Sequence, residues 1–70
     1  MTDESLRARA IAYVAGLVSS YRAALRVPRL PLTGVTFYHE RIRALTRELA
    51  ELQGSDGIAH ARRWAKVTPL

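Results

Sequence analysis

The chain has 70 residues, no cysteine and a formal net charge of +5 at pH 7. A chain of this length buries only a small core, and without cysteine it has neither a disulfide nor a thiol nucleophile. The positive charge favours an anionic partner such as nucleic acid. Ten of its 11 basic residues are arginine, which also fits a coding bias unrelated to function. We expect a single helical domain over residues 1–70 of a cytoplasmic protein.

The first predicted helix covers about 3–26 and contains an uncharged run from Ala10 to Tyr21. Apolar side chains recur along it in steps of three and four, including Ile11, Val14 and Val18, which places them on one face of a helix. The uncharged run has 12 residues, whereas a helix needs about 20 apolar residues to span a bilayer. We therefore expect no membrane-spanning segment.

The residues on the opposite face of this helix are mostly small and none is charged, whereas a surface helix usually carries charged residues there. One interpretation is that the face is simply exposed to water. We favour the interpretation that it packs against a second chain, because small side chains let two helix backbones approach closely and a short chain has few elements to cover one helix. The predicted interface consists of Ala12, Tyr13, Gly16, Ser19, Ser20 and Ala23.

An extended connector is predicted over 27–34, because Pro28 disfavours helical structure at the residue before it. The second helix is predicted over about 35–53. Its apolar residues again recur in steps of four and three, which is the pattern of a helix that packs in a bundle. The residues of this seam are Tyr38, Ile42, Leu45, Leu49 and Leu52.

The residue types that bind metals or catalyse reactions form no recognisable set in this sequence. Glu48 and Glu51 flank the apolar seam and are expected to face solvent, and Asp56 and His60 have the i,i+4 spacing of a link within one helix. No glycine-rich phosphate loop and no nucleophile elbow is present. We therefore expect a non-catalytic protein with no metal, no cofactor and no small-molecule substrate.

The third predicted helix is short, about 56–67, and carries Trp64 among basic residues. With Ala50 and Gly54 before it, this part of the chain resembles the repressor-type helix-turn-helix family, in which the second helix contacts DNA. The register departs from that pattern at His60, where the family has an apolar anchor. No family is assigned on this resemblance.

The net charge comes from two short segments, because the other charges are balanced by neighbours. Short connections favour antiparallel neighbours, so we expect a helical hairpin followed by the short third helix. This topology directs the third helix back toward the connector and unites both segments in one basic patch. The predicted nucleic-acid-binding residues are Arg22, Arg26, Arg29, Arg62, Arg63, Trp64 and Lys66.

Taken together, these patterns predict an all-α homodimer in which two copies complete a helical bundle and bind nucleic acid or act in regulation, without catalysis. The alternative is a protein–protein interaction module, such as an adaptor, an inhibitor or a small subunit of a larger complex, whose first helix docks on a different protein. The two interpretations differ in oligomeric state and in salt-sensitive binding to nucleic acid.

Overall fold

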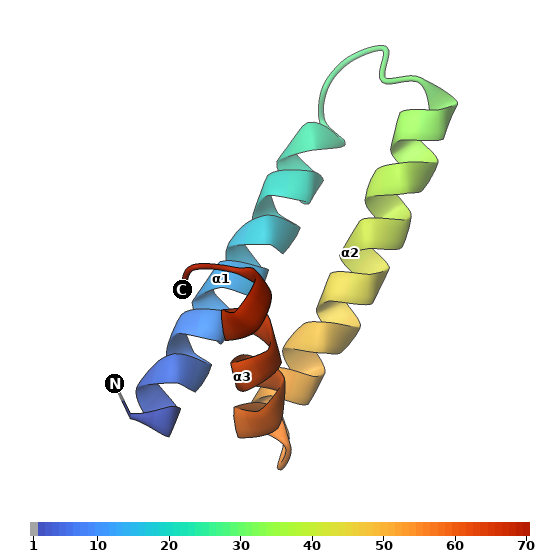
Figure 1. Cartoon of the computed structure of the whole chain (residues 1–70). Coiled ribbons are helices and arrows are strands. Elements are labelled where there is room, and N and C mark those ends of the chain that lie inside the picture. The colour runs from blue at the N-terminus through green and yellow to red at the C-terminus, as the bar shows by residue number, and fades with distance from the viewer. Residues whose placement is uncertain (1) are drawn as a thin grey trace.

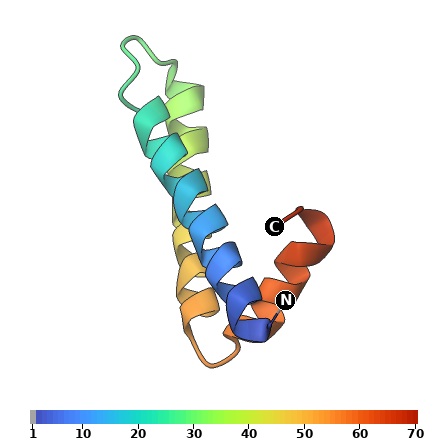
Figure 2. The same cartoon turned by 90° about the vertical axis from the view of Figure 1, so that its left-hand side faces the viewer.

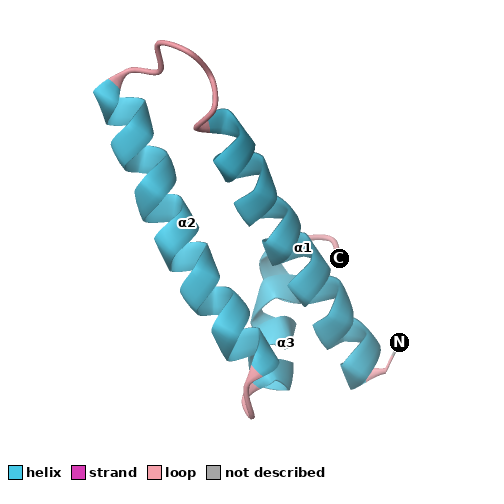
Figure 3. Cartoon of the chain, turned by 180° about the vertical axis from the view of Figure 1, so that it is seen from behind, coloured by secondary structure: helices cyan, strands magenta, loops and turns pink. Residues whose placement is uncertain are grey.

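The computed structural model describes residues 2–70 and contains three α-helices: α1 (Asp3–Ala24), α2 (Leu32–Gln53) and α3 (Gly57–Val67). Helices α1 and α2 run antiparallel as a hairpin, and α3 packs on one side of it, at the end away from the connector (Figures 1 and 2). Only helices and loops occur in the described part of the chain (Figure 3). The expected all-α fold, a hairpin followed by a short third helix, is confirmed.

Helix α1 begins where its sequence offers a cap. The Thr2 side chain accepts a hydrogen bond from the backbone N–H of Ser5 at 3.0 Å, which satisfies one of the free donors of the first turn. The helix ends at Ala24, two residues before the predicted end. The chain then tightens into turns, with the Val27 N–H bonded to the Ala24 carbonyl, because Pro28 does not favour a helical residue before it.

The prediction that the second helix begins near residue 35 is wrong. Helix α2 begins at Leu32, directly after Pro31, and the Val35 N–H donates to the Pro31 carbonyl at 3.0 Å. Proline suits a helix start, because its ring holds φ near −65° and the donor it lacks has no partner there anyway. The connector is correspondingly short, and it turns at Arg29, which has a φ of 62°.

The core lies where the three helices meet. Its fully buried side chains include Val14 from α1, Leu52 from α2 and Ala61 from α3. The seam predicted along the second helix lies on the inner face of α2, since Leu45 and Leu52 are buried and the other seam residues are partly buried. The complete set of buried apolar residues is Ala10, Val14, Val18, Leu45, Leu52 and Ala61.

Helix α3 starts within one residue of its predicted position and ends at Val67, as predicted. Gly57 at its start is buried against the last turn of α2. At about 1.5 Å per residue, 11 residues extend only about 16 Å, half the length of α1. Consequently α3 covers one half of the hairpin and leaves the connector half as a two-helix structure (Figure 2). Within residues 2–70, no helix has both the length and the apolar character needed to cross a membrane.

Candidate functional site

The predicted interface on α1 is exposed to solvent in this structure. Helix α2 covers the Val14 and Val18 side of α1, and the opposite side is exposed. Tyr13 contacts α3, since its ring centroid lies 5.8 Å from that of Trp64, yet Tyr13 remains 38% exposed. The exposed interface residues are Ala12, Tyr13, Gly16, Ser19, Ser20 and Ala23.

Small residues form a continuous exposed line along this side of α1, which we call the small-residue stripe. Successive members are three or four residues apart, so they lie on one face of the helix. A side chain added at Gly16 would meet no atom within 4 Å. A second helix is therefore free to approach the α1 backbone closely here. The stripe consists of Ser5, Ala8, Ala12, Gly16, Ser19 and Ala23.

A groove of about 450 Å³ between α1 and α2 adjoins the small-residue stripe and shares Ser19 and Ala23 with it. Val18 and Leu49 contribute apolar surface to its lining. Its other lining residues are Ala15, Arg22, Arg26 and Thr46. None of the lining residues comes from α3, so this side of the hairpin is open beside the stripe.

The predicted single basic patch is not formed. Arg62 donates a hydrogen bond to the Asp3 carboxylate at 2.9 Å, which places the α3 arginines at the start of α1. Arg22 lies near the opposite end of α1, roughly 28 Å away along the helix axis at about 1.5 Å per residue. The topology was predicted correctly, but α3 is too short to reach the connector. The basic residues therefore form two separate groups.

Some of the predicted nucleic-acid-binding residues of α3 already form hydrogen bonds with other side chains of the protein. The Trp64 indole N–H donates to the Glu48 carboxylate at 2.9 Å, and the Trp64 ring is half-buried. Arg63 donates to the His60 ring, while Lys66 is exposed. In the other group, Arg22, Arg26 and Arg29 are all exposed and, among residues 2–70, join no ion pair.

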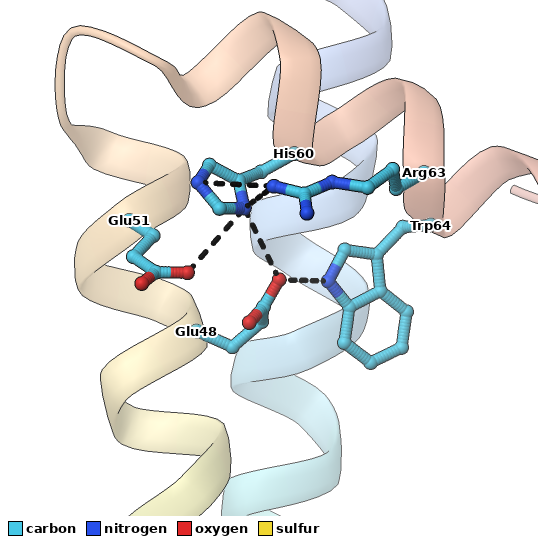
Figure 4. A network of polar contacts seen from close by, with 5 residues as sticks. All are labelled: Glu48, Glu51, His60, Arg63 and Trp64. Atoms are coloured by element: carbon cyan, nitrogen blue, oxygen red, sulfur yellow. Dashed lines mark hydrogen bonds and ion pairs between the residues drawn. The ribbon is translucent and has the colours of Figure 1, made fainter.

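A polar cluster joins α2 to α3 on the side of the hairpin that α3 covers (Figure 4). His60 Nδ1 lies 3.6 Å from Glu48 Oε1 and 3.3 Å from Glu51 Oε2. The expectation that both glutamates simply face solvent is wrong for Glu48, which is partly covered and bonded to Trp64. The side chain of His60 also turns to these carboxylates and not to the side chain of Asp56. The only hydrogen bond between His60 and Asp56 runs from the His60 backbone N–H to the Asp56 carbonyl.

One sequence signal for this cluster was overlooked. Glu48 and Glu51 lie one helical turn apart, and His60 and Trp64 have i,i+4 spacing, so each pair shares one helix face. The short turn between α2 and α3 brings the two faces together. Periodicity within each helix shows the pairs, but only the packing of α3 on α2 shows that they meet.

No protein-family model matches this chain, and no curated protein or solved structure shows significant similarity to it. The candidate sites are thus defined by the chain's own residues. They are the small-residue stripe of α1, the exposed arginines near the connector, and the cluster of Glu48, Glu51 and His60.

Proposed function

We propose that this chain is a non-catalytic binding protein that acts as a homodimer joined through α1. The observation that carries the proposal is the exposed small-residue stripe. Its spacing of three and four residues is that of a packed helix seam, yet no element of the chain covers it. Alanine, glycine and serine let two helices approach closely, so that many backbone and side-chain atoms make van der Waals contact.

A second copy of the chain fits this stripe by charge as well as by shape. In an antiparallel pair with its two-fold axis at Gly16, Ala12 faces the partner's Ser20. The acidic first turn of α1, with Asp3 and Glu4, then lies toward the partner's basic end, where Arg22 is in the last turn of α1 and Arg26 follows it. Opposite charges meet at both ends of the seam, and the two helix dipoles oppose each other favourably.

Dimerisation would also add stability to a chain whose own core is small. The core of the described chain contains only six buried apolar side chains, and small single cores contribute little net stability. Covering the stripe and the adjoining groove would remove exposed apolar surface of Ala15, Ala23 and Leu49 from water. Each 100 Å² of apolar surface removed from water contributes about 2.5 kcal/mol, before the entropic cost of association.

We expect Gly16→Arg to convert the dimer to a monomer without unfolding it. A long charged side chain would separate the two backbones at the two-fold axis, whereas within one chain it meets no atom within 4 Å. Sedimentation velocity should give twice the chain mass of 7.8 kDa for the unchanged protein and 7.8 kDa for the variant. Circular dichroism should show the same helix content in both.

The matched control is Ala50→Arg, at an exposed position of α2 outside the stripe, and this variant should remain dimeric. A monomeric unchanged protein, or a Gly16→Arg variant that still sediments as a dimer, would overturn the homodimer proposal. In the first case the alternative of a different protein partner for the α1 face would take its place.

Nucleic acid is a second candidate ligand, favoured by the charge of Arg22, Arg26 and Arg29. These arginines lie near one end of the hairpin and are free of ion pairs within residues 2–70. Cationic groups that contact phosphates displace condensed counterions, so log affinity falls linearly with log salt. A binding protein of this kind would present one such group of arginines per chain.

If Arg29 contacts a phosphate of duplex DNA, Arg29→Ala should lower the slope of log affinity against log salt by about 1. The matched control is Arg47→Ala, because Arg47 is one turn from Glu51 and its charge is balanced locally. Fluorescence anisotropy at several salt concentrations measures both slopes. Equal slopes for the two variants, or a slope near zero for the unchanged protein, would refute nucleic-acid binding at this end.

A further inference from the structure

We infer that Glu48, Glu51 and His60 form a binding site for a divalent transition-metal ion, with zinc as the best-fitting ion. The three side chains come from two helices, and their potential ligand atoms all lie within 4.8 Å of one another. Figure 4 shows both carboxylates directed toward the same nitrogen of the His60 ring. The site is on the α2–α3 side of the molecule and uses no residue of the small-residue stripe, so it does not depend on the proposed dimer.

The distances from His60 to the two carboxylates fit tetrahedral zinc. Zinc binds histidine nitrogen and carboxylate oxygen at about 2.0–2.2 Å, so two ligands of a tetrahedral site lie about 3.3–3.6 Å apart. His60 Nδ1 is 3.3 Å from Glu51 Oε2 and 3.6 Å from Glu48 Oε1. The potential ligand oxygens of the two glutamates lie within 4.8 Å of each other, so the carboxylates would rotate toward an ion placed between the three side chains.

The ligand types favour zinc over the common hard cations. Mg²⁺ and Ca²⁺ are bound mainly by oxygen, whereas an imidazole nitrogen with two carboxylates suits zinc and its neighbours. Two ionised glutamates balance the charge of a divalent ion. Three protein ligands leave the fourth position of the ion to water, and a surface pocket of about 320 Å³ lined by Glu48, Glu51 and His60 gives access to it.

Neighbouring side chains hold two of the three ligands in place. The Trp64 indole N–H donates to Glu48 Oε1 at 2.9 Å, and hydrogen bonds of this kind orient metal-binding carboxylates. The His60 side chain is only 15% exposed, so its ring has little freedom to turn away. Glu51 is 44% exposed and is free to adjust toward an ion.

Arg63 is the natural competitor for this position. Its Nη2 lies 2.6 Å from His60 Nδ1 and 3.3 Å from Nε2, and its side chain is exposed. A bound ion would take the place of this guanidinium, which is free to swing into solvent. Arg63 therefore opposes metal binding by its positive charge and by occupying the position of the ion. Its loss should strengthen metal binding at a true metal site, whereas its loss from a purely structural ion-pair network should only weaken the network.

Titration of the full-length protein with zinc chloride tests the site, by calorimetry and by the fluorescence of Trp64, the only tryptophan of the chain. We expect one zinc ion per chain. His60→Gln should weaken zinc binding at least about tenfold. Loss of a residue that binds the metal directly should reduce affinity at least as much as loss of a residue that only orients a ligand. His39→Gln, which removes the other histidine at an exposed position away from the cluster, should leave binding unchanged.

Two further variants separate metal binding from structure. Glu51→Gln alters an exposed side chain, so the fold should persist while zinc affinity falls. Arg63→Gln removes the competing cation and should strengthen zinc binding by about tenfold, since a positive charge a few Å from the ion repels it. The inference is overturned if zinc gives no saturable signal, if His60→Gln and His39→Gln behave alike, or if Arg63→Gln weakens binding.

Discussion

Gly57→Ala should destabilise the fold by about 3 kcal/mol, near the upper end of the usual cost of overpacking. A Cβ at position 57 would overlap the carbonyl oxygen of Leu52 and would lie 2.8 Å from Cδ of Arg7. The arginine side chain is able to move, but the Leu52 carbonyl belongs to the last turn of α2 and moves only if that turn unwinds. The close approach of α3 to α2 thus requires glycine at this position.

Thermal unfolding followed by circular dichroism measures this effect, and the melting temperature should fall by roughly 12–24 °C for a domain of this size. Gly34→Ala is the matched control. Its new methyl group would meet only the Leu30 side chain, at 3.4 Å, and alanine favours a helix over glycine by up to about 1 kcal/mol. Gly34→Ala should therefore be neutral or mildly stabilising. Equal effects of the two substitutions would contradict the close α2–α3 contact.

Leu52→Ala should lower the free energy of unfolding by about 2–5 kcal/mol, the cost of removing a buried leucine side chain and leaving a cavity. Leu52 is 0% exposed and is one of the two largest fully buried side chains. It belongs to the same core cluster as Ala10 of α1 and Ala61 of α3, so its loss loosens all three helices together. Since small domains are stable by only a few kcal/mol, much of the variant should be unfolded.

Urea unfolding at one fixed protein concentration measures this loss, because self-association would otherwise change the apparent stability. The matched control is Leu32→Ala, which makes the same chemical change at a position that is 79% exposed. Leu32→Ala should change the free energy of unfolding by no more than a few tenths of a kcal/mol, so its urea midpoint should stay close to that of the unchanged protein. A Leu52→Ala midpoint close to that of Leu32→Ala would mean that the core is not centred where the three helices meet.

The helices and their inner faces were determined by the sequence alone. A helix places residues three and four apart on one side, so the apolar steps that end at Leu52 predicted which face of α2 is buried. The same rule identified the uncharged outer face of α1, which is exposed in the structure. Both properties depend on local geometry, and each helix carries that information within itself. The start of α2 was missed because Pro31 was taken as part of the connector and not as the residue before a helix.

The meeting of side chains from different helices was decided only by the tertiary structure. The length of α3 and its angle to the hairpin place Arg62 beside Asp3 and not beside the connector, so one expected basic patch became two groups. The same packing brings His60 to Glu48, although each residue alone resembles an ordinary polar position of a surface helix. Periodicity fixes which way a side chain points from its own helix axis. Which side chain it then contacts depends on how the turn between α2 and α3 orients the two axes, and no repeat within either helix encodes that angle.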